Sequence, residues 1–161
     1  MASWQFDIDL LPRPKVLELY SVLPKNIETK VYENTEWCDG FRLPDNFREI
    51  LDNFLPRNKA WLSDTLEWGT EEGHRVSIGV GADEVRWVSI RIDVRDLNMS
   101  LINYLVDFAR RSDCLMLLTG NMKIISPSQS HLLAEIEASR AAKFVSNPKE
   151  YFGELKTTLF R

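Results

Sequence analysis

Residues 66–118 contain, in chain order, the segments LEWGT (66–70), HRVSIGV (74–80), VRWVSIRIDV (85–94), SLINYLVDFARR (100–111) and CLMLL (114–118). The second and third segments alternate apolar and polar residues with the period of two that is typical of strands. Turns with glycine precede both segments. The fourth segment has apolar residues at helical spacing, and the fifth is an apolar run. The stretch therefore predicts a three-strand meander, a helix and one more strand.

The alternation also predicts which side chains face the core. One parity of the second and third strands is apolar and consists of Val76, Ile78, Val80, Val88, Ile90 and Ile92. Arg91 and Asp93 have the opposite parity, so we expect them on the face away from the helix at 100–111. A register slip of one residue would reverse every side chain, which makes this a sharp prediction.

Shorter patterns predict the elements on either side of this stretch. We expect strands at 4–10, 27–31 and 122–125, helices at 14–23 and 45–54, one long helix at 127–145, and a final short helix that includes Phe152. The strand, helix and strand in succession predict a right-handed crossover. The expected fold is therefore a single α+β domain over residues 1–161, with a mixed, largely antiparallel sheet and helices packed mainly on one face.

Composition limits the classes of function. The net charge is −4, with 20 basic and 24 acidic residues, which argues against nonspecific binding to nucleic acid or to an anionic membrane. No apolar run approaches the roughly 18 residues of a membrane span, and the N-terminal residues lack a targeting pattern. Cys38 and Cys114 are too few for a disulfide framework. We expect a soluble cytoplasmic protein.

Signatures of metal, nucleotide or covalent chemistry are lacking in the sequence. The two histidines, His74 and His131, are far apart and no CxxC or HxxxH motif occurs, so we expect no bound metal. The Gly79–Gly81 pair lacks the third glycine and the following helix of a phosphate-binding loop, so no cofactor is expected. A Cys114/His74 nucleophile pair is less favoured than a core thiol and a turn histidine.

The segment at residues 33–41 combines acidic and aromatic side chains, namely Glu33, Glu36, Trp37, Asp39 and Phe41. Such a loop is typical of a protein interface, in which Trp37 would be an exposed anchor. In the alternative, Trp37 and Phe41 fold inward as a lid over the core while the acidic side chains stay in solvent. The alternative is favoured.

Two further candidates are cationic. Arg91 belongs to a charged sheet face that either is a solvated surface with ion pairs, which is favoured, or receives a partner or an anionic ligand. Arg140 is expected on the long helix between Leu133 and Phe144, where a structural ion pair or a position reaching solvent is favoured over an anion site.

These observations predict a small non-enzymatic domain that binds a protein partner, of the immunity-protein or regulatory-adaptor type. The acidic-aromatic loop and five tryptophans support this interpretation, and an acidic surface would match a basic partner. The alternative is a domain that binds a small molecule, or an enzyme of unfamiliar type, with Arg91, Asp93 and His74 or Arg140 in a polar cleft. The oligomeric state is left open.

Overall fold

A computed structural model of the chain describes residues 2–59, 63–82 and 84–151. Asp83 in the expected second turn and Phe152 in the expected last helix lie outside these residues. The strands are β1 (Gln5–Pro12), β2 (Arg57–Asn58), β3 (Thr65–Gly69), β4 (Arg75–Val80), β5 (Val85–Asp93), β6 (Cys114–Leu118) and β7 (Lys123–Ile125). The helices are α1 (Arg13–Tyr20), α2 (Thr29–Glu33), α3 (Phe47–Phe54), α4 (Met99–Arg111), α5 (Gln129–Glu137) and α6 (Arg140–Ser146).

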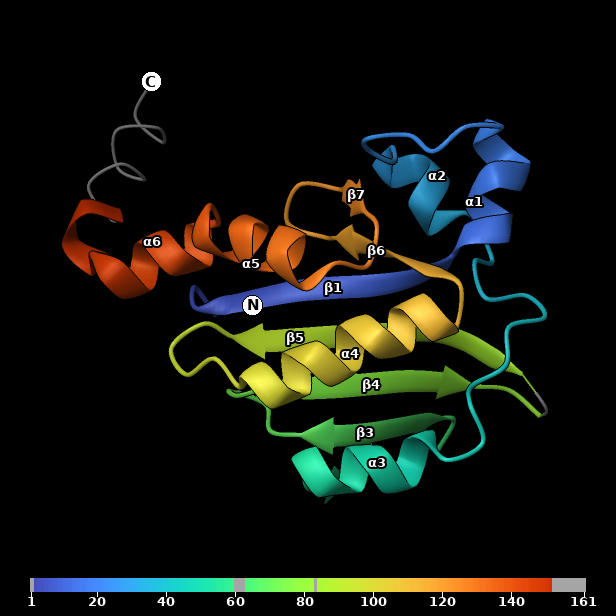
Figure 1. Cartoon of the computed structure of the whole chain (residues 1–161), viewed down its shortest axis with the longest axis horizontal. Helices are drawn as coiled ribbons and strands as arrows, with labels where there is room; N and C mark the ends of the chain where they lie inside the picture. The colour runs from blue at the N-terminus through green and yellow to red at the C-terminus, as the bar shows by residue number, and fades with distance from the viewer. Residues whose placement is uncertain (1, 60–62, 83, 152–161) are drawn as a thin grey trace.

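The strands form one seven-stranded sheet in the order β2-β3-β4-β5-β1-β6-β7 (Figure 1). Helices α3, α4 and α5 lie side by side over one face of this sheet, while α1 and α2 lie together near the end formed by β6 and β7 (Figure 1). The expected α+β class, with a largely antiparallel sheet and helices mainly on one face, is confirmed. Within the described residues no helix combines the length and the apolarity that crossing a bilayer requires.

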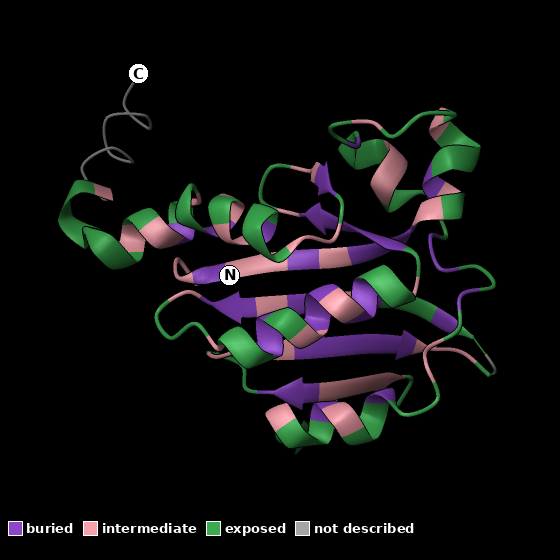
Figure 2. Cartoon of the chain, in the orientation of Figure 1, coloured by how far each residue is buried: buried purple, intermediate pink, exposed green. Residues whose placement is uncertain are grey.

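The predicted alternation in the meander is confirmed. Ile78, Val88, Ile90 and Ile92 are at most 2% exposed and belong to the core beneath α4. Figure 2 shows the buried strands at the centre and the exposed outer sides of the helices. Val80 is only half-buried because the register between β4 and β5 shifts at Gly79 and Val80. This irregularity turns Val80 partly out of the core.

The crossover from β5 through α4 to β6 is present, but the sheet is not mixed. β1 lies between β5 and β6 and is antiparallel to both. The two strands joined by α4 therefore point the same way without pairing. Every strand pair between described residues is antiparallel. Because β1 comes from the N-terminal end of the chain, the local pattern at 85–118 holds no sign of this insertion.

The single helix expected at 127–145 is wrong, because the chain forms two shorter helices. The Ser139 hydroxyl donates to the carbonyl of Ile136 at 2.6 Å and accepts from the backbone N–H of Ala142 at 3.2 Å. These bonds end α5 and cap the start of α6, since a serine hydroxyl competes with the helical backbone for its partners. Further along, residues 148–151 are helical, as expected.

The strand expected at 27–31 is also wrong. Only Asn26 forms a bridge, with Lys123 of β7, and the chain then turns into α2. Ile27 is buried and Val31 packs against the core. Apolar residues four positions apart fit a helical turn as well as a strand, so this short run did not distinguish the two.

Candidate functional site on the open sheet face

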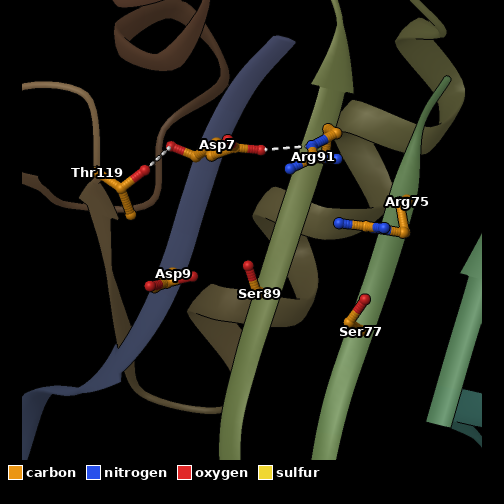
Figure 3. A pocket seen from close by; sticks show the side chains of 7 residues that line it. All are labelled: Asp7, Asp9, Arg75, Ser77, Ser89, Arg91 and Thr119. Carbon is orange, nitrogen blue, oxygen red and sulfur yellow. Dashed lines mark hydrogen bonds and ion pairs between the residues drawn. The ribbon is translucent and has the colours of Figure 1, made fainter. Parts of the chain in front are cut away.

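The face of the sheet opposite α3, α4 and α5, here called the open face, carries polar side chains from three neighbouring strands. Strand register places Arg91 opposite both Asp7 and Arg75, so these three residues form one row across β1, β5 and β4. The same register forms a second row of Asp9, Ser89 and Ser77. The alternation in each strand thus directs a band of charged and hydroxyl groups to one surface (Figure 3).

These rows line a hollow of about 200 Å³, here called the charged hollow. Its lining residues are Asp7, Asp9, Arg75, Ser77, Ser89, Arg91 and Thr119 (Figure 3). Arg91 Nε donates to Asp7 Oδ1 at 2.8 Å, and both side chains are largely buried. A buried carboxylate requires such a partner to remain charged. The Arg91–Asp7 pair therefore fixes one wall of the hollow.

Asp9 lines the charged hollow on the side nearest α2. Its carboxylate accepts a hydrogen bond from the Tyr32 hydroxyl. Burial raises the pKa of Asp9, while the hydrogen bonds from Tyr32 and Ser89 oppose that rise. Burial and the Asp9 carboxylate likewise raise the pKa of Tyr32 well above the usual tyrosine value. The Tyr32–Asp9 contact thus ties α2 to the open face.

A second and larger hollow adjoins the first at Asp9 and has a volume of about 660 Å³. We call it the acidic-aromatic hollow. Its polar lining comprises Asp9, Tyr32, Glu33, Thr35, Glu36, Asp39, Glu84 and Arg86, and its apolar lining includes Leu11, Trp37, Val85 and Trp87. Glu33, Glu36 and Asp39 of the predicted loop therefore line one cavity together.

Trp87 supplies an exposed aromatic surface at this hollow. Its indole lies against Gly79 on the neighbouring strand, where an added Cβ would come within 2.3 Å of Nε1. The side chain is nevertheless 42% exposed. A glycine at position 79 therefore lets a large ring lie flat on the sheet with one side toward solvent.

The loop itself adopts the favoured inward arrangement, and an exposed Trp37 anchor is wrong. Trp37 is 6% exposed and Phe41 is 9% exposed, whereas the acidic side chains of the segment are exposed. Trp37 Nε1 donates to the carbonyl of Tyr32 at 3.0 Å, and the two rings are stacked. Burial of the large rings removes more apolar area from water than an anchor position would. Trp37 therefore forms a wall of the hollow.

Asp93 and His74 do not belong to either hollow. Asp93 is bound through both carboxylate oxygens by Arg95, and its backbone N–H donates to His74 Nδ1 at 3.1 Å. His74 Nε2 lies 2.8 Å from the carbonyl of Asp96, so both ring nitrogens are used. This cluster joins the turn before β4 to the end of β5. A polar cleft that combines Arg91, Asp93 and His74 is therefore wrong, and these groups have a structural role.

The Asp93–Arg95 pair leads to a pH prediction. Burial works to raise the pKa of Asp93, but the hydrogen bonds and the charge of Arg95 outweigh it and the pKa is lowered. A lowered folded-state pKa stabilises the fold above the unfolded value of about 3.9, and this contribution is lost as the pH falls through the folded value. Asp93→Asn should therefore have a lower Tm than the wild type at pH 7, and the difference should shrink as the pH falls below the unfolded-state pKa. Thermal melts over a series of decreasing pH values measure this, and a difference that does not shrink on acidification would exclude the charge as its cause.

Arg140 lies in neither hollow. It is exposed at the first position of α6, because the break at Ser139 turns this part of the chain away from the position expected on one long helix. Asp7, Asp9, Tyr32, Arg75 and Trp87 line the hollows and are absent from the residues proposed from sequence. The alternation that placed Arg91 on the open face is the signal that could have found Arg75 and Trp87, whereas the pairing of β1 with β5 carried no local signal.

Metal ligands do not converge in the part of the chain that the structure describes, where no group of three His, Cys, Asp or Glu side chains is arranged to hold an ion. Cys38 and Cys114 are free and buried. Burial raises the pKa of Cys38 to about 11 and that of Cys114 to about 12. Both are therefore neutral thiols near pH 7, and neither is an activated nucleophile.

Comparisons with protein-family models, with curated proteins and with solved structures give no match to this chain. The chemistry of the open face is therefore inferred from its own residues: a hollow lined by two arginines, two aspartates and three hydroxyl groups, which adjoins an acidic and aromatic one.

Proposed function

We propose that this protein is a non-enzymatic binding domain that receives a basic segment of a partner protein in the acidic-aromatic hollow. The observation that carries the proposal is the charge of its lining. Five carboxyl side chains, Asp9, Glu33, Glu36, Asp39 and Glu84, are opposed there by a single cation, Arg86. Four of these acids are exposed and available to a ligand. Such an excess of carboxylates attracts a basic ligand and repels an acidic one.

The aromatic residues support a cationic occupant further. The exposed face of Trp87 is available to a guanidinium or ammonium group, which is attracted by the ring quadrupole. The volume of about 660 Å³ lies within the range of pockets that enclose a small ligand, so it accommodates one or two long basic side chains. An immunity protein that neutralises a basic toxin, or a regulatory adaptor, would use a surface of this kind. A cytoplasmic location belongs to the same proposal and accords with two free thiols.

A peptide titration tests this proposal. An unstructured peptide rich in arginine and lysine is added to ¹⁵N-labelled protein at low salt, and amide and indole resonances are followed by NMR. We expect saturable shifts at residues 33–39 and at the Trp87 indole N–H. Trp87→Ala should weaken binding by about 2- to 30-fold, which corresponds to the loss of one cation–π contact. Glu36→Gln should weaken it by a smaller factor and reduce its salt dependence.

Two controls separate this site from a general attraction to an acidic protein. Asp107→Asn removes a half-exposed carboxylate, paired with Arg111, from α4 on the other side of the sheet, and Leu97→Ala removes an exposed apolar side chain. Both variants should bind the peptide as the wild type does. Equal weakening by Asp107→Asn and Glu36→Gln, or equal binding of a glutamate-rich peptide, would refute the proposal.

A further inference from the structure

The charged hollow contains a cation without a partner. Arg75 is half-buried, and within the described part of the chain its guanidinium has neither an ion pair nor a hydrogen bond. Figure 3 shows it extending from β4 toward Arg91 on β5. The two arginines are directly opposite in the strand register, an arrangement that is unfavourable for like charges. An oxyanion in the hollow would give the Arg75 guanidinium the counterion that it lacks.

The remaining lining supplies hydrogen-bonding groups for such an anion. The Ser77 and Thr119 hydroxyls donate long bonds of 3.3 Å, to Glu67 Oε2 and to the Asp7 carbonyl respectively. Arg91 donates to Asp7 through Nε. Its two terminal nitrogens, Nη1 and Nη2, have no hydrogen bond among the described residues. The hollow of about 200 Å³ is smaller than the pockets of drug-sized ligands and suits a single compact group.

We propose that Arg75 and Arg91 bind a small oxyanion, namely inorganic phosphate, sulfate or the equivalent group of a larger ligand. The planar guanidinium fork of Arg75 matches two oxygens of such a group. Asp7 does not repel it strongly, because Arg91 already neutralises that carboxylate. The other carboxylate, Asp9, is turned to Tyr32, with which it forms a hydrogen bond.

This site is separate from the hollow proposed for a basic segment. The two cavities share only Asp9. The charged hollow balances Arg75 and Arg91 against Asp7 and Asp9, whereas the acidic-aromatic hollow has an excess of carboxylates. A test of the anion site is therefore independent of a test of the basic partner. Trp87→Ala, which weakens the basic peptide in that proposal, should leave anion binding unchanged.

A titration with sodium sulfate tests the anion site. Sulfate replaces chloride at constant ionic strength while the Nε–H resonances of the arginine side chains are followed by NMR. We expect saturable shifts of the Arg75 and Arg91 resonances, and Kd increased roughly tenfold or more in Arg75→Gln, since a charge-assisted bidentate contact is lost. Arg75→Lys keeps the charge without the fork, so its Kd should lie between those of the wild type and Arg75→Gln. Parallel titrations with phosphate and acetate distinguish a tetrahedral from a carboxylate group.

Arg111→Gln is the matched control, because it removes an exposed arginine from α4 on the opposite side of the sheet. It should bind sulfate as the wild type does. Arg75→Gln should fold, since Arg75 has no partner to lose among the described residues, and its amide spectrum and Tm verify this. Absence of saturation in the wild type, or equal Kd values for the wild type and Arg75→Gln, would overturn the assignment.

Discussion

Replacing Trp37 by alanine is expected to lower the free energy of unfolding by about 3–5 kcal/mol, the usual cost of emptying a site filled by a buried tryptophan. Trp37 is only 6% exposed and is a member of the main core. Its Nε1–H bond to the Tyr32 carbonyl is lost as well, which leaves that carbonyl without this partner. Tyr32 in turn binds Asp9, so the substitution removes support from the segment that walls the acidic-aromatic hollow.

Trp87→Ala is the matched control for this prediction. Trp87 lines the same hollow but is 42% exposed, so its removal leaves little cavity and should cost less than about 1 kcal/mol. Urea denaturation of the wild type and both variants gives the comparison. A small loss for Trp37→Ala would show that the ring is not part of the core in solution, and the exposed-anchor hypothesis would return.

Gly69→Ala is expected to destabilise the fold by about 3 kcal/mol or more, because strain and a steric clash add together. Gly69 has φ +98, a conformation that side chains with a Cβ rarely adopt, and an added Cβ would lie 1.9 Å from the carbonyl oxygen of His74. That oxygen accepts the hydrogen bond of the Thr70 N–H, which closes the turn between β3 and β4. The neighbouring atoms are backbone, so they cannot move aside without opening this turn.

Gly40→Ala separates the two causes. Gly40 also has a positive φ of +73, but nothing lies within 4 Å of an added Cβ. Its substitution should therefore cost only the backbone strain, about 1 kcal/mol. Gly120 has neither constraint, since nothing lies within 4 Å and φ is not positive, so Gly120→Ala should be close to neutral. Similar losses for Gly69→Ala and Gly40→Ala would show that the turn relaxes and that the clash has no consequence.

Much of the fold was predictable because it depends on local periodicity. The alternation at 74–94 predicted the burial of Ile78 and Ile90 and the outward position of Arg91, all of which the structure shows. The helix at 100–111 carried its apolar face and a basic last turn in its own sequence. Errors arose where two local preferences competed: Ser139 broke a continuous helical pattern, and four-residue spacing at 27–31 fitted two elements.

The candidate site was predicted only in part. The acidic residues Glu33, Glu36 and Asp39 stood out by composition, and the structure places them around one hollow. For Trp37, the inward alternative was correct and the exposed anchor was wrong. Composition does not show whether a ring lies in the core or in solvent. Arg91 was identified from parity, whereas its partner Asp7 was not, since the two are 84 residues apart.

For the strands of the meander, the sequence by itself determined which side chains share a face, because alternation of side chains is a property of the strand alone. It also determined the absence of the spacing that metal and nucleotide motifs require. Only the tertiary structure decided that β1 lies between β5 and β6, and this strand order brings the residues of the site together. Strand order depends on contacts between distant segments, which no local period encodes. The insertion of β1 places Asp7 and Asp9 beside Arg91 and Ser89, and thereby creates both hollows.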